Sequence, residues 1–310
     1  MLYLGIDLGG TGIKAGITDE TGRILCQGSC RTAPERGWEA VADDMVLLAG
    51  KLQRQCGEAP AAAGVGIPGA VNPRTGAVLR CVNLNWNDVP LSDRLQKTLG
   101  MPVFVGNDAN VAAAAEAAAG ASRGIRDSVL LTLGTGVGSG IILDGRMREG
   151  VHGAAAEIGH TVLVAGGVSC SCGKRGCVDR YCSATGLIRM AEEELEHRPD
   201  SVLAGKKLDA RMVLEAALDG DPAAETAFDR YTDYLTLTLN NIIHTLDPEV
   251  IILGGGVSGA GEALLRPVEQ KLDKLLLFPE LGRPEIRIAA LGNDAGIIGA
   301  AMLARQGVQS

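Results

Sequence analysis

The chain opens with three short apolar segments that are separated by glycine-rich turns. The predicted strands cover residues 2–10, 13–19 and 20–29, with a turn at Gly22. The next segment differs, because its apolar residues recur every three or four positions, as is typical of an amphipathic helix over 38–56. These residues are Val41, Met45, Leu48 and Leu52.

Strand and helix then alternate up to residue 119. A strand over 63–69 is followed by a short helix over 91–100, with Ser92 or Asp93 expected near its N-cap. Strand and Ala-rich helix follow, over 101–108 and 110–119. The predicted order for this part is βββαβαβα.

The pattern restarts at residue 128, which indicates an internal duplication. The stretch SVLLTLGTGVGSG reproduces LYLGIDLGGTG, and a second strand and turn follow over 140–147. Asp221 and Pro222 begin a long predicted helix, DPEVIILGGG then predicts a turn and a buried strand, and 296–307 is a last amphipathic helix. The apolar positions of the long helix are Phe228, Tyr231, Leu235, Ile242 and Leu246.

Composition and charge exclude several classes of partner. At 310 residues the chain is about twice a typical domain, so two domains are expected. A formal charge of −8 disfavours nucleic acid. No apolar run reaches membrane-spanning length and the N-terminus lacks a basic region, so we expect a cytoplasmic protein without a membrane segment. Eight cysteines without a signal peptide favour free thiols or a metal over disulfides.

Three glycine clusters follow predicted strands, at 7–14, 133–140 and 253–259. Glycine lets backbone N–H groups converge on an anion. Each cluster alone is equally consistent with a tight hairpin, but three together favour a nucleotide, and no Walker-type motif is present. Residues 254–259 also fit G-x-G-x-x-G, which raises a dinucleotide-binding oxidoreductase as an alternative. That fold needs an acid at the end of the next strand, whereas Glu269 and Asp273 lie in a helix-like stretch, so we assign this loop to the floor of a nucleoside site.

Two further features carry candidate chemistry. Cys170, Cys172 and Cys177 have C-x-C-x4-C spacing, and zinc typically takes four ligands; His160 and Cys182 are both candidates for the fourth. Three buried thiols or a redox pair are the metal-free alternatives. Asp108 follows the strand PVFVG, where it is either a helix cap or a carboxylate at the ligand-binding edge of a sheet.

Seven motifs resemble those of the ROK family of sugar kinases and repressors, and they span nearly the whole chain in family order. They are DLGGTGIK, GIPG (66–69), NDAN (107–110), LGTGVGSG, EIGH (157–160), CSCGKRGC (170–177) and ILGGGV (252–257). The resemblance implies an α/β protein of two duplicated ribonuclease H-like (actin-like ATPase) domains with a cleft between them. We expect an N-terminal domain over 1–118, a larger domain over 119–293 that holds the zinc knuckle 160–177, and a final helix, about 294–310, that packs back on the first domain.

The resemblance also implies roles for individual residues. Asp108 would be the general base, ionised at an ordinary pKa of about 4, and Asp7 would orient Mg²⁺ through water. The residues implied in sugar binding are Gly69, Asn83, Asn107, Asp108, Glu157, His160 and Asp179. Those implied in ATP binding are Asp7, Gly9, Gly10, Thr11, Lys14, Gly134, Thr135, Gly136, Gly138, Gly254, Gly255 and Gly256. The resemblance also implies that His160, with Cys170, Cys172 and Cys177, binds a structural Zn²⁺.

Two positions depart from the family pattern, because Asp179 stands where a glutamate is usual and Ala156 where glycine is common. Family repressors carry a helix-turn-helix before the first glycine loop, and we expect no room for one ahead of Leu2, which favours an enzyme over a regulator. The segment 82–91 resembles that of family glucokinases, so the expected reaction is ATP-dependent phosphorylation of glucose to glucose 6-phosphate. N-acetylmannosamine, N-acetylglucosamine and other hexose kinases, and a sugar sensor without turnover, are the alternatives. A homodimer or homotetramer is expected.

Overall fold

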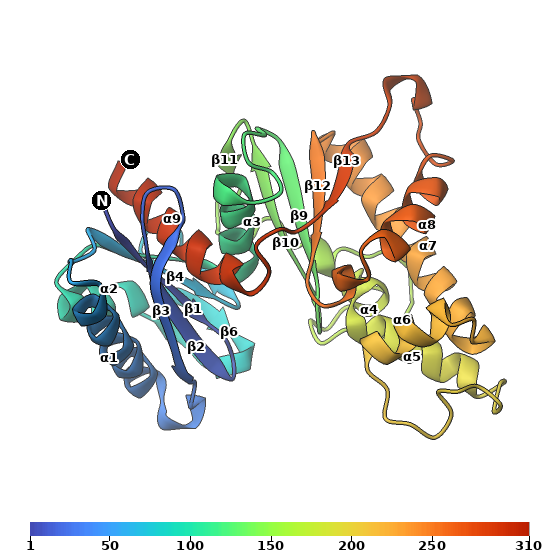
Figure 1. Cartoon of the computed structure of the whole chain (residues 1–310), viewed down its shortest axis with the longest axis horizontal. Helices are drawn as coiled ribbons and strands as arrows, with labels where there is room; N and C mark the ends of the chain where they lie inside the picture. Colours follow the sequence, from blue (N-terminus) through green and yellow to red (C-terminus); the bar gives the residue numbers. More distant parts are fainter. Residues whose placement is uncertain (310) are drawn as a thin grey trace. The chain divides into compact units, whose positions relative to one another are not determined.

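The computed structural model describes residues 1–309 and divides into two compact units (Figure 1). The first unit contains Met1–Arg126, Gly140–Ala156 and the chain from Ala290 on, and the second contains Asp127–Ser139 and Glu157–Ala289. The chain therefore passes from one unit to the other four times. A single boundary between residues 118 and 119 does not describe this division, because residues 140–156 return to the first unit.

The two five-stranded sheets have the same topology. The first has the order β3-β2-β1-β4-β8 and the second the order β11-β10-β9-β12-β13. The central strand of each sheet is the first strand of that half of the chain, β1 or β9. It pairs in parallel with a strand that follows much later in the sequence: β1 with β4, and β9 with β12. The bounds are β1 Tyr3–Leu8, β2 Gly12–Thr18, β3 Ile24–Arg31, β4 Ala62–Ile67, β8 Val103–Asn107, β9 Ser128–Leu133, β10 Val137–Leu143, β11 Arg146–Met147, β12 Val250–Gly254 and β13 Glu285–Ile288. The predicted duplication is confirmed.

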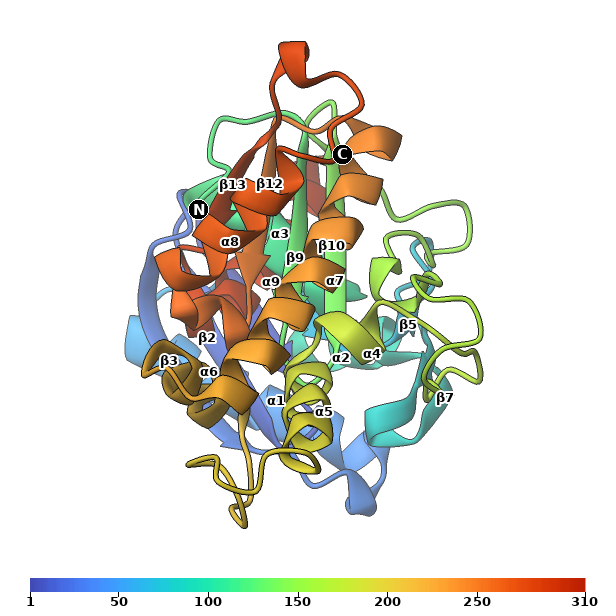
Figure 2. The same ribbon diagram turned by 90° about the vertical axis from the view of Figure 1, so that its right-hand side faces the viewer.

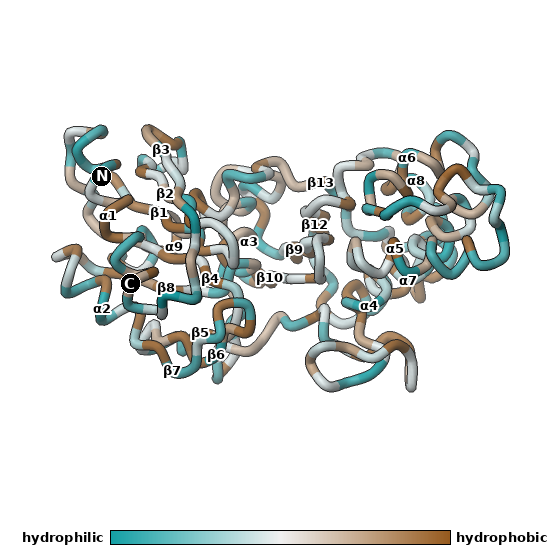
Figure 3. Tube along the Cα trace, turned by 90° about the horizontal axis from the view of Figure 1, so that it is seen from below, coloured by the Kyte–Doolittle hydropathy of each residue, from teal (hydrophilic) through white to brown (hydrophobic). Residues whose placement is uncertain are grey.

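Helices cover both faces of the first sheet (Figure 1). On one face, α1 (Trp38–Cys56) packs on β2 and β3, and α2 (Leu91–Leu99) on β8. On the other, α3 (Asp108–Ala119) and α9 (Ala295–Gln309) pack against each other, and α9 lies on β1 and β4. A Cβ added at Gly64 would lie 1.8 Å from the carbonyl oxygen of Ala300, so only glycine allows this close approach. Figure 3 shows the hydrophobic segments gathered along β1, β4 and α9.

A small antiparallel sheet in the first unit was not predicted. It is formed by β5 (Ala70–Val71), β6 (Val78–Cys81) and β7 (Trp86–Val89). These strands have only two to four residues each, too few for an alternating pattern to be recognised. The segment 82–91 is therefore only partly a loop, because β7 lies within it.

A long helix organises the second unit. Helix α7 (Pro222–Leu246) begins as predicted, since the Asp221 side chain caps it by accepting from the N–H groups of Ala223 and Ala224. Four other helices pack against α7, as Figure 2 shows. They are α4 (Asp179–Cys182), α5 (Ala184–Leu195), α6 (Ala210–Leu218) and α8 (Glu262–Leu272). Glu269 lies in α8, as expected.

Helix α2 starts at Leu91 as predicted, but its expected cap and the predicted start of α3 are wrong. The N-cap of α2 is Pro90, and Ser92 lies inside the helix, where its hydroxyl donates to the carbonyl oxygen of Val103 at 2.7 Å. This bond to a neighbouring strand could not be read from local sequence. Helix α3 begins at Asp108 and not at residue 110, because Asn107 caps it. Among the described residues, no helix combines the length and apolar character that crossing a bilayer requires.

Candidate active site and metal-binding cluster

Asp108 lies at the carboxyl end of β8, at the first position of α3. The helix is capped by Asn107, whose side-chain oxygen accepts from the N–H groups of Ala109 (2.9 Å) and Asn110 (3.2 Å). The Asn107 amide donates to the carbonyl oxygen of Gly69 at 3.1 Å, which ties the GIPG loop to this site. Asn107 does the capping, and Asp108 is an exposed residue whose Oδ1 accepts from the N–H group of Ala109 at 2.9 Å.

The pKa of Asp108 is raised from its ordinary value of 3.8, chiefly because surrounding protein atoms partly remove its carboxyl from water. Hydrogen bonds from backbone N–H groups oppose this shift without cancelling it. The expectation of an ordinary pKa is therefore wrong. A base with a raised pKa holds a transferred proton more firmly, which suits general-base chemistry near neutral pH.

Asp7 forms a second acidic position close to the first. It pairs with Lys14 across β1 and β2, so both side chains lie on one face of the sheet. Burial raises the pKa of Asp7, the Lys14 ammonium lowers it, and the charge of Asp108 raises it further. The structure thus places Asp7, Lys14 and Asp108 within electrostatic reach of one another.

The first glycine loop is held in one conformation. Gly9 donates its N–H to the carbonyl oxygen of Gly12 at 2.9 Å, and the buried Thr32 donates its hydroxyl to Gly9 and its N–H to Thr11. A Cβ added at Gly10 would lie 3.8 Å from the Cβ of Asn83. Asn83, expected in the sugar site, therefore lies beside this loop.

Cys81 lies in the same region, near Asn83 and Asp108. Its side chain is 1% exposed. Burial raises the pKa of its thiol, backbone hydrogen bonds from Leu84 and Asn83 oppose this, and the nearby charge of Asp108 adds to it. An isolated cysteine carries no signal that would distinguish this position in the sequence.

The second and third glycine clusters lie together in the second unit. A Cβ added at Gly255 would lie 2.6 Å from backbone atoms of Leu133, the first residue of the second cluster. In that second cluster, Gly134 donates to the carbonyl oxygen of Gly136 and Gly138 donates to the Thr132 hydroxyl. Thr135 and Gly256 are exposed, and Gly254 ends β12. These two clusters therefore form adjoining loops at the ends of β9 and β12.

Glu157 is exposed and precedes the short 3-10 helix Ile158–His160. The N–H group of Ile158 donates to the Ser139 hydroxyl at 3.1 Å, which fixes the start of this turn. Ala156 has a φ of 63°, in the left-handed region that favours glycine. The unusual alanine at this position is thus accommodated with backbone strain.

His160, Cys170, Cys172 and Cys177 form one cluster, in which all four ligand atoms lie within 4.8 Å of one another. The Cys170 sulfur lies 3.7 Å from Nδ1 of His160, and the Cys172 and Cys177 sulfurs are 3.6 Å apart. A tetrahedron with metal–sulfur bonds of about 2.3 Å has edges of about 3.8 Å, so the arrangement fits a four-coordinate metal. Cys182 lies elsewhere, with its sulfur 3.4 Å from the Thr238 hydroxyl.

The thiols of the cluster differ in their electrostatic environment. Burial, with hydrogen bonds to the neighbouring thiols, raises the pKa of Cys177 to about 12. A backbone hydrogen bond from Lys174 is the main cause that lowers the pKa of the exposed Cys172. Because a metal binds thiolates, its binding would have to displace the proton from Cys177.

Asp179 lies against the second glycine loop. Its Oδ1 accepts from the N–H group of Val137 at 2.8 Å. The predicted sugar ligand therefore has one of its two carboxylate oxygens engaged by the backbone of a predicted phosphate loop.

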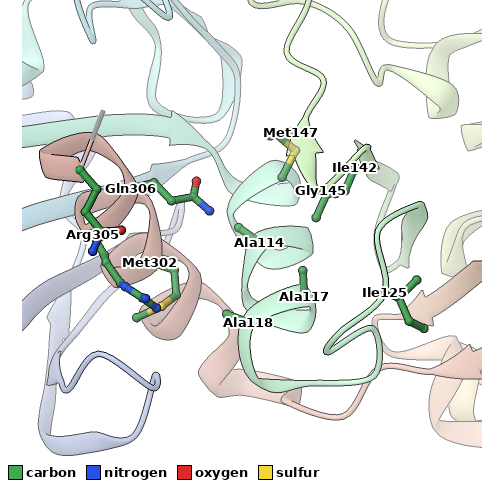
Figure 4. Close-up of a pocket in the computed structure, with 11 residues that line it drawn as sticks. Ala114, Ala117, Ala118, Ile125, Ile142, Gly145, Met147, Met302, Arg305 and Gln306 are labelled. Atoms are coloured by element: carbon green, nitrogen blue, oxygen red, sulfur yellow. The ribbon is translucent and has the colours of Figure 1, made fainter.

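A cavity between helices of the first unit is not a candidate for catalysis. This cavity of about 360 Å³ is lined by residues of α3, α9 and the segment 142–147, and Figure 4 shows Ala114 and Ala118 on the side of α3 toward α9. Arg305 is the only charged residue among those that line it. Proton transfer needs a group such as the carboxylate of Asp108, which lies at the other end of α3.

Comparison with known proteins gives consistent matches over the whole chain. A family model described as ROK family matches residues 3–307. Glucokinases of Halalkalibacterium halodurans and Thermotoga maritima are 39% and 37% identical to this chain, over 98% of it and over 95% and 97% of their own length. The crystal structure of a Streptomyces griseus ROK family glucokinase in complex with glucose and AMPPNP superimposes with a TM-score of 0.84, at 36% identity, over 99% of this chain and 100% of that one. The predicted fold class is confirmed.

Proposed function

This chain belongs to the ROK family. We propose that it is an ATP-dependent hexokinase-type kinase whose preferred sugar is glucose, with Asp108 as the general base. The observation that carries the proposal is the placement of Asp108. Asp108 is an exposed residue, Asn107 and not Asp108 caps the helix, and the charge of Asp108 acts on Asp7.

The proposed mechanism assigns one task to each group of residues. Asp108 accepts the proton of the acceptor hydroxyl as that oxygen attacks the terminal phosphorus of ATP, and the bond from phosphorus to the bridging oxygen breaks to release ADP. Little further covalent help is required, since positioning and charge stabilisation supply most of the rate. The raised pKa of Asp108 supports its role as proton acceptor.

The glycine loops are proposed to hold ATP. Backbone N–H groups of the first loop, with Thr11 and Lys14, and of the second loop, with Thr135, would contact the phosphates. The third cluster, Gly254 to Gly256, would form the floor for the nucleoside. Asp7 would orient Mg²⁺ through water from its half-buried position just before the first glycine loop.

The sugar is proposed to be recognised by paired donors and acceptors. Asn83, Asn107, Glu157 and His160 are assigned to its hydroxyl groups, with the loop that ends at Gly69 on one side. A buried polar group left without a partner costs about 1–3 kcal/mol, which is enough to discriminate between epimers. The contact of Nδ1 of His160 with the thiol cluster leaves Nε2 for a different partner.

A panel of sugars tests the proposal directly. ADP release would be measured with glucose, mannose, allose, N-acetylglucosamine and N-acetylmannosamine, and glucose should give the highest kcat/KM. Asp108→Asn should lower kcat by about 10²- to 10⁴-fold, whereas Asp93→Asn, at an exposed position of α2, should leave kcat unchanged. Absence of turnover with every sugar, or full activity of the Asp108→Asn variant, contradicts the assignment.

The Cys/His cluster is proposed to bind one structural Zn²⁺. With three thiolates and one histidine no coordination position remains open, so the ion would stabilise the turn from Glu157 to His160 and would not act on the substrate. Cys172→Ser, at an exposed position, should abolish zinc binding in elemental analysis. Cys182→Ser should retain it, because Cys182 lies outside the cluster. Loss of zinc in Cys182→Ser would make Cys182 a ligand, and retention of zinc in Cys172→Ser would contradict the proposed site.

A further inference from the structure

The second glycine loop is fastened to the segment that follows the metal-binding cluster. Three bonds hold it there. Oδ1 of Asp179 accepts from the N–H group of Val137 at 2.8 Å. The N–H group of Ala184 donates to the carbonyl oxygen of Gly134 at 2.8 Å. The Thr185 hydroxyl donates to the carbonyl oxygen of Thr135 at 3.1 Å. Of these partners only Asp179 uses a charged side chain, and hydrogen bonds to a charged group are the stronger ones.

Gly136 shows how closely Asp179 and the loop fit. A Cβ added at Gly136 would lie 2.6 Å from Oδ1 of Asp179, with the next contact at 3.7 Å in the same carboxylate. The φ of Gly136 is outside the left-handed region, so the backbone itself would accept another residue. The requirement for glycine at this position therefore comes from the carboxylate of Asp179 alone.

Asp179 is in turn held in place by its own neighbours. It lies two residues after Cys177, a member of the metal-binding cluster. The N–H group of the intervening Val178 donates to the carbonyl oxygen of Thr161, which follows His160. The carboxylate thus projects toward the loop from a backbone that is tied, on its N-terminal side, to the segment that holds the cluster.

We propose that Asp179 is a positioning residue for the second glycine loop, and that it acts on nucleotide binding more than on sugar binding. This inference rests on the proposed function, in which that loop contacts the phosphates of ATP. A glutamate at position 179 carries one more methylene, so its carboxylate could not occupy the same place without moving the backbone or the loop. The aspartate is therefore matched to Gly136.

The experiment is a double-mutant cycle read by nucleotide affinity. Asp179→Ala should raise the Kd for Mg·ADP without sugar, and the KM for ATP, by about tenfold, because the Val137 N–H loses a charged acceptor. Gly136→Ala should have a similar effect. In the Asp179→Ala background, however, Gly136→Ala should have little additional effect, because the carboxylate that its methyl group meets is gone.

Two further variants separate positioning from general damage. Asp179→Asn retains an oxygen that can accept from Val137, so it should keep the KM for ATP within about threefold of wild type. Glu192→Ala, at an exposed position of α5, should leave every constant unchanged. Unfolding midpoints and zinc content would be measured for each variant.

The proposal is overturned if Asp179→Ala raises only the KM for glucose and leaves ADP affinity unchanged, or if the two substitutions act independently. Failure of the proposed function itself would look different, because the wild-type protein would then bind no ADP and turn over no sugar.

Discussion

Replacement of Glu116 should destabilise the first unit by an amount that follows from its hydrogen bonds. This carboxylate is 1% exposed and lies in α3. Its Oε2 accepts from the N–H groups of Ala121 (2.6 Å) and Ala290 (3.1 Å), and its Oε1 accepts from Leu291 (3.0 Å). It thereby joins the end of α3 to the segment that enters α9.

Glu116→Gln can keep at most two of these three bonds, because its NH₂ group must face at least one N–H donor. We expect a loss of about 2 kcal/mol, and about 4 kcal/mol for Glu116→Ala, which leaves all three donors without the carboxylate. The first unit has about 160 residues, for which 1 kcal/mol corresponds to about 3 °C in Tm. The expected decreases are therefore about 6 °C and about 12 °C.

Thermal unfolding followed by calorimetry or circular dichroism measures these shifts. Glu58→Gln, at an exposed position, is the matched control and should change the free energy of unfolding by less than about 0.5 kcal/mol. If Glu116→Gln unfolds at the wild-type temperature, the bonds to Ala290 and Leu291 do not stabilise this junction and the reasoning is refuted.

Three further predictions concern the site. The pKa of Asp108 is raised in the folded protein, so the acid limb of kcat/KM should lie above pH 3.8. Ionisation of Asp108 should also destabilise the fold as pH rises through that raised pKa. Asp108→Asn should therefore unfold at a higher temperature than wild type at neutral pH, and a lower Tm would contradict this. Ala156→Gly should relieve the strain of a φ of 63° and stabilise the protein by about 0.5 kcal/mol in urea denaturation, with a loss of stability as the opposing result. Chelation under reducing conditions should release about one zinc ion per chain and lower the Tm, and an unchanged Tm would argue against a structural metal.

Much of the fold could be predicted because the relevant signals are local. The helical spacing of Val41, Met45, Leu48 and Leu52 predicted α1 with its observed bounds. The Asp-Pro pair at 221–222 predicted the start of α7, since the cap and the first turn involve only neighbouring residues. The repeated strand-and-glycine pattern at residues 2 and 128 predicted two sheets of equal topology.

Other elements could not be predicted, because their residues carry too short or too weak a pattern. Strands β5 to β7 have two to four residues each, and the alternation of side chains needs a longer run to be visible. No helix was predicted for the segments that form α5 and α6. The cap of α2 was wrongly predicted because the Ser92 hydroxyl bonds to a different element, β8, instead of capping its own helix.

The sequence by itself determined which residues are available for chemistry: the carboxylate after β8, the three glycine loops and the three closely spaced thiols. Only the tertiary structure decided how these groups are held, because distance along the sequence does not show which side chains meet in space. It brought His160 and not Cys182 to the thiols, freed Asp108 from capping through Asn107, and joined Asp179 to Val137 across 42 positions of sequence. Local periodicity reports how a segment meets its immediate neighbours, whereas a hydrogen bond between distant segments depends on how the whole unit packs.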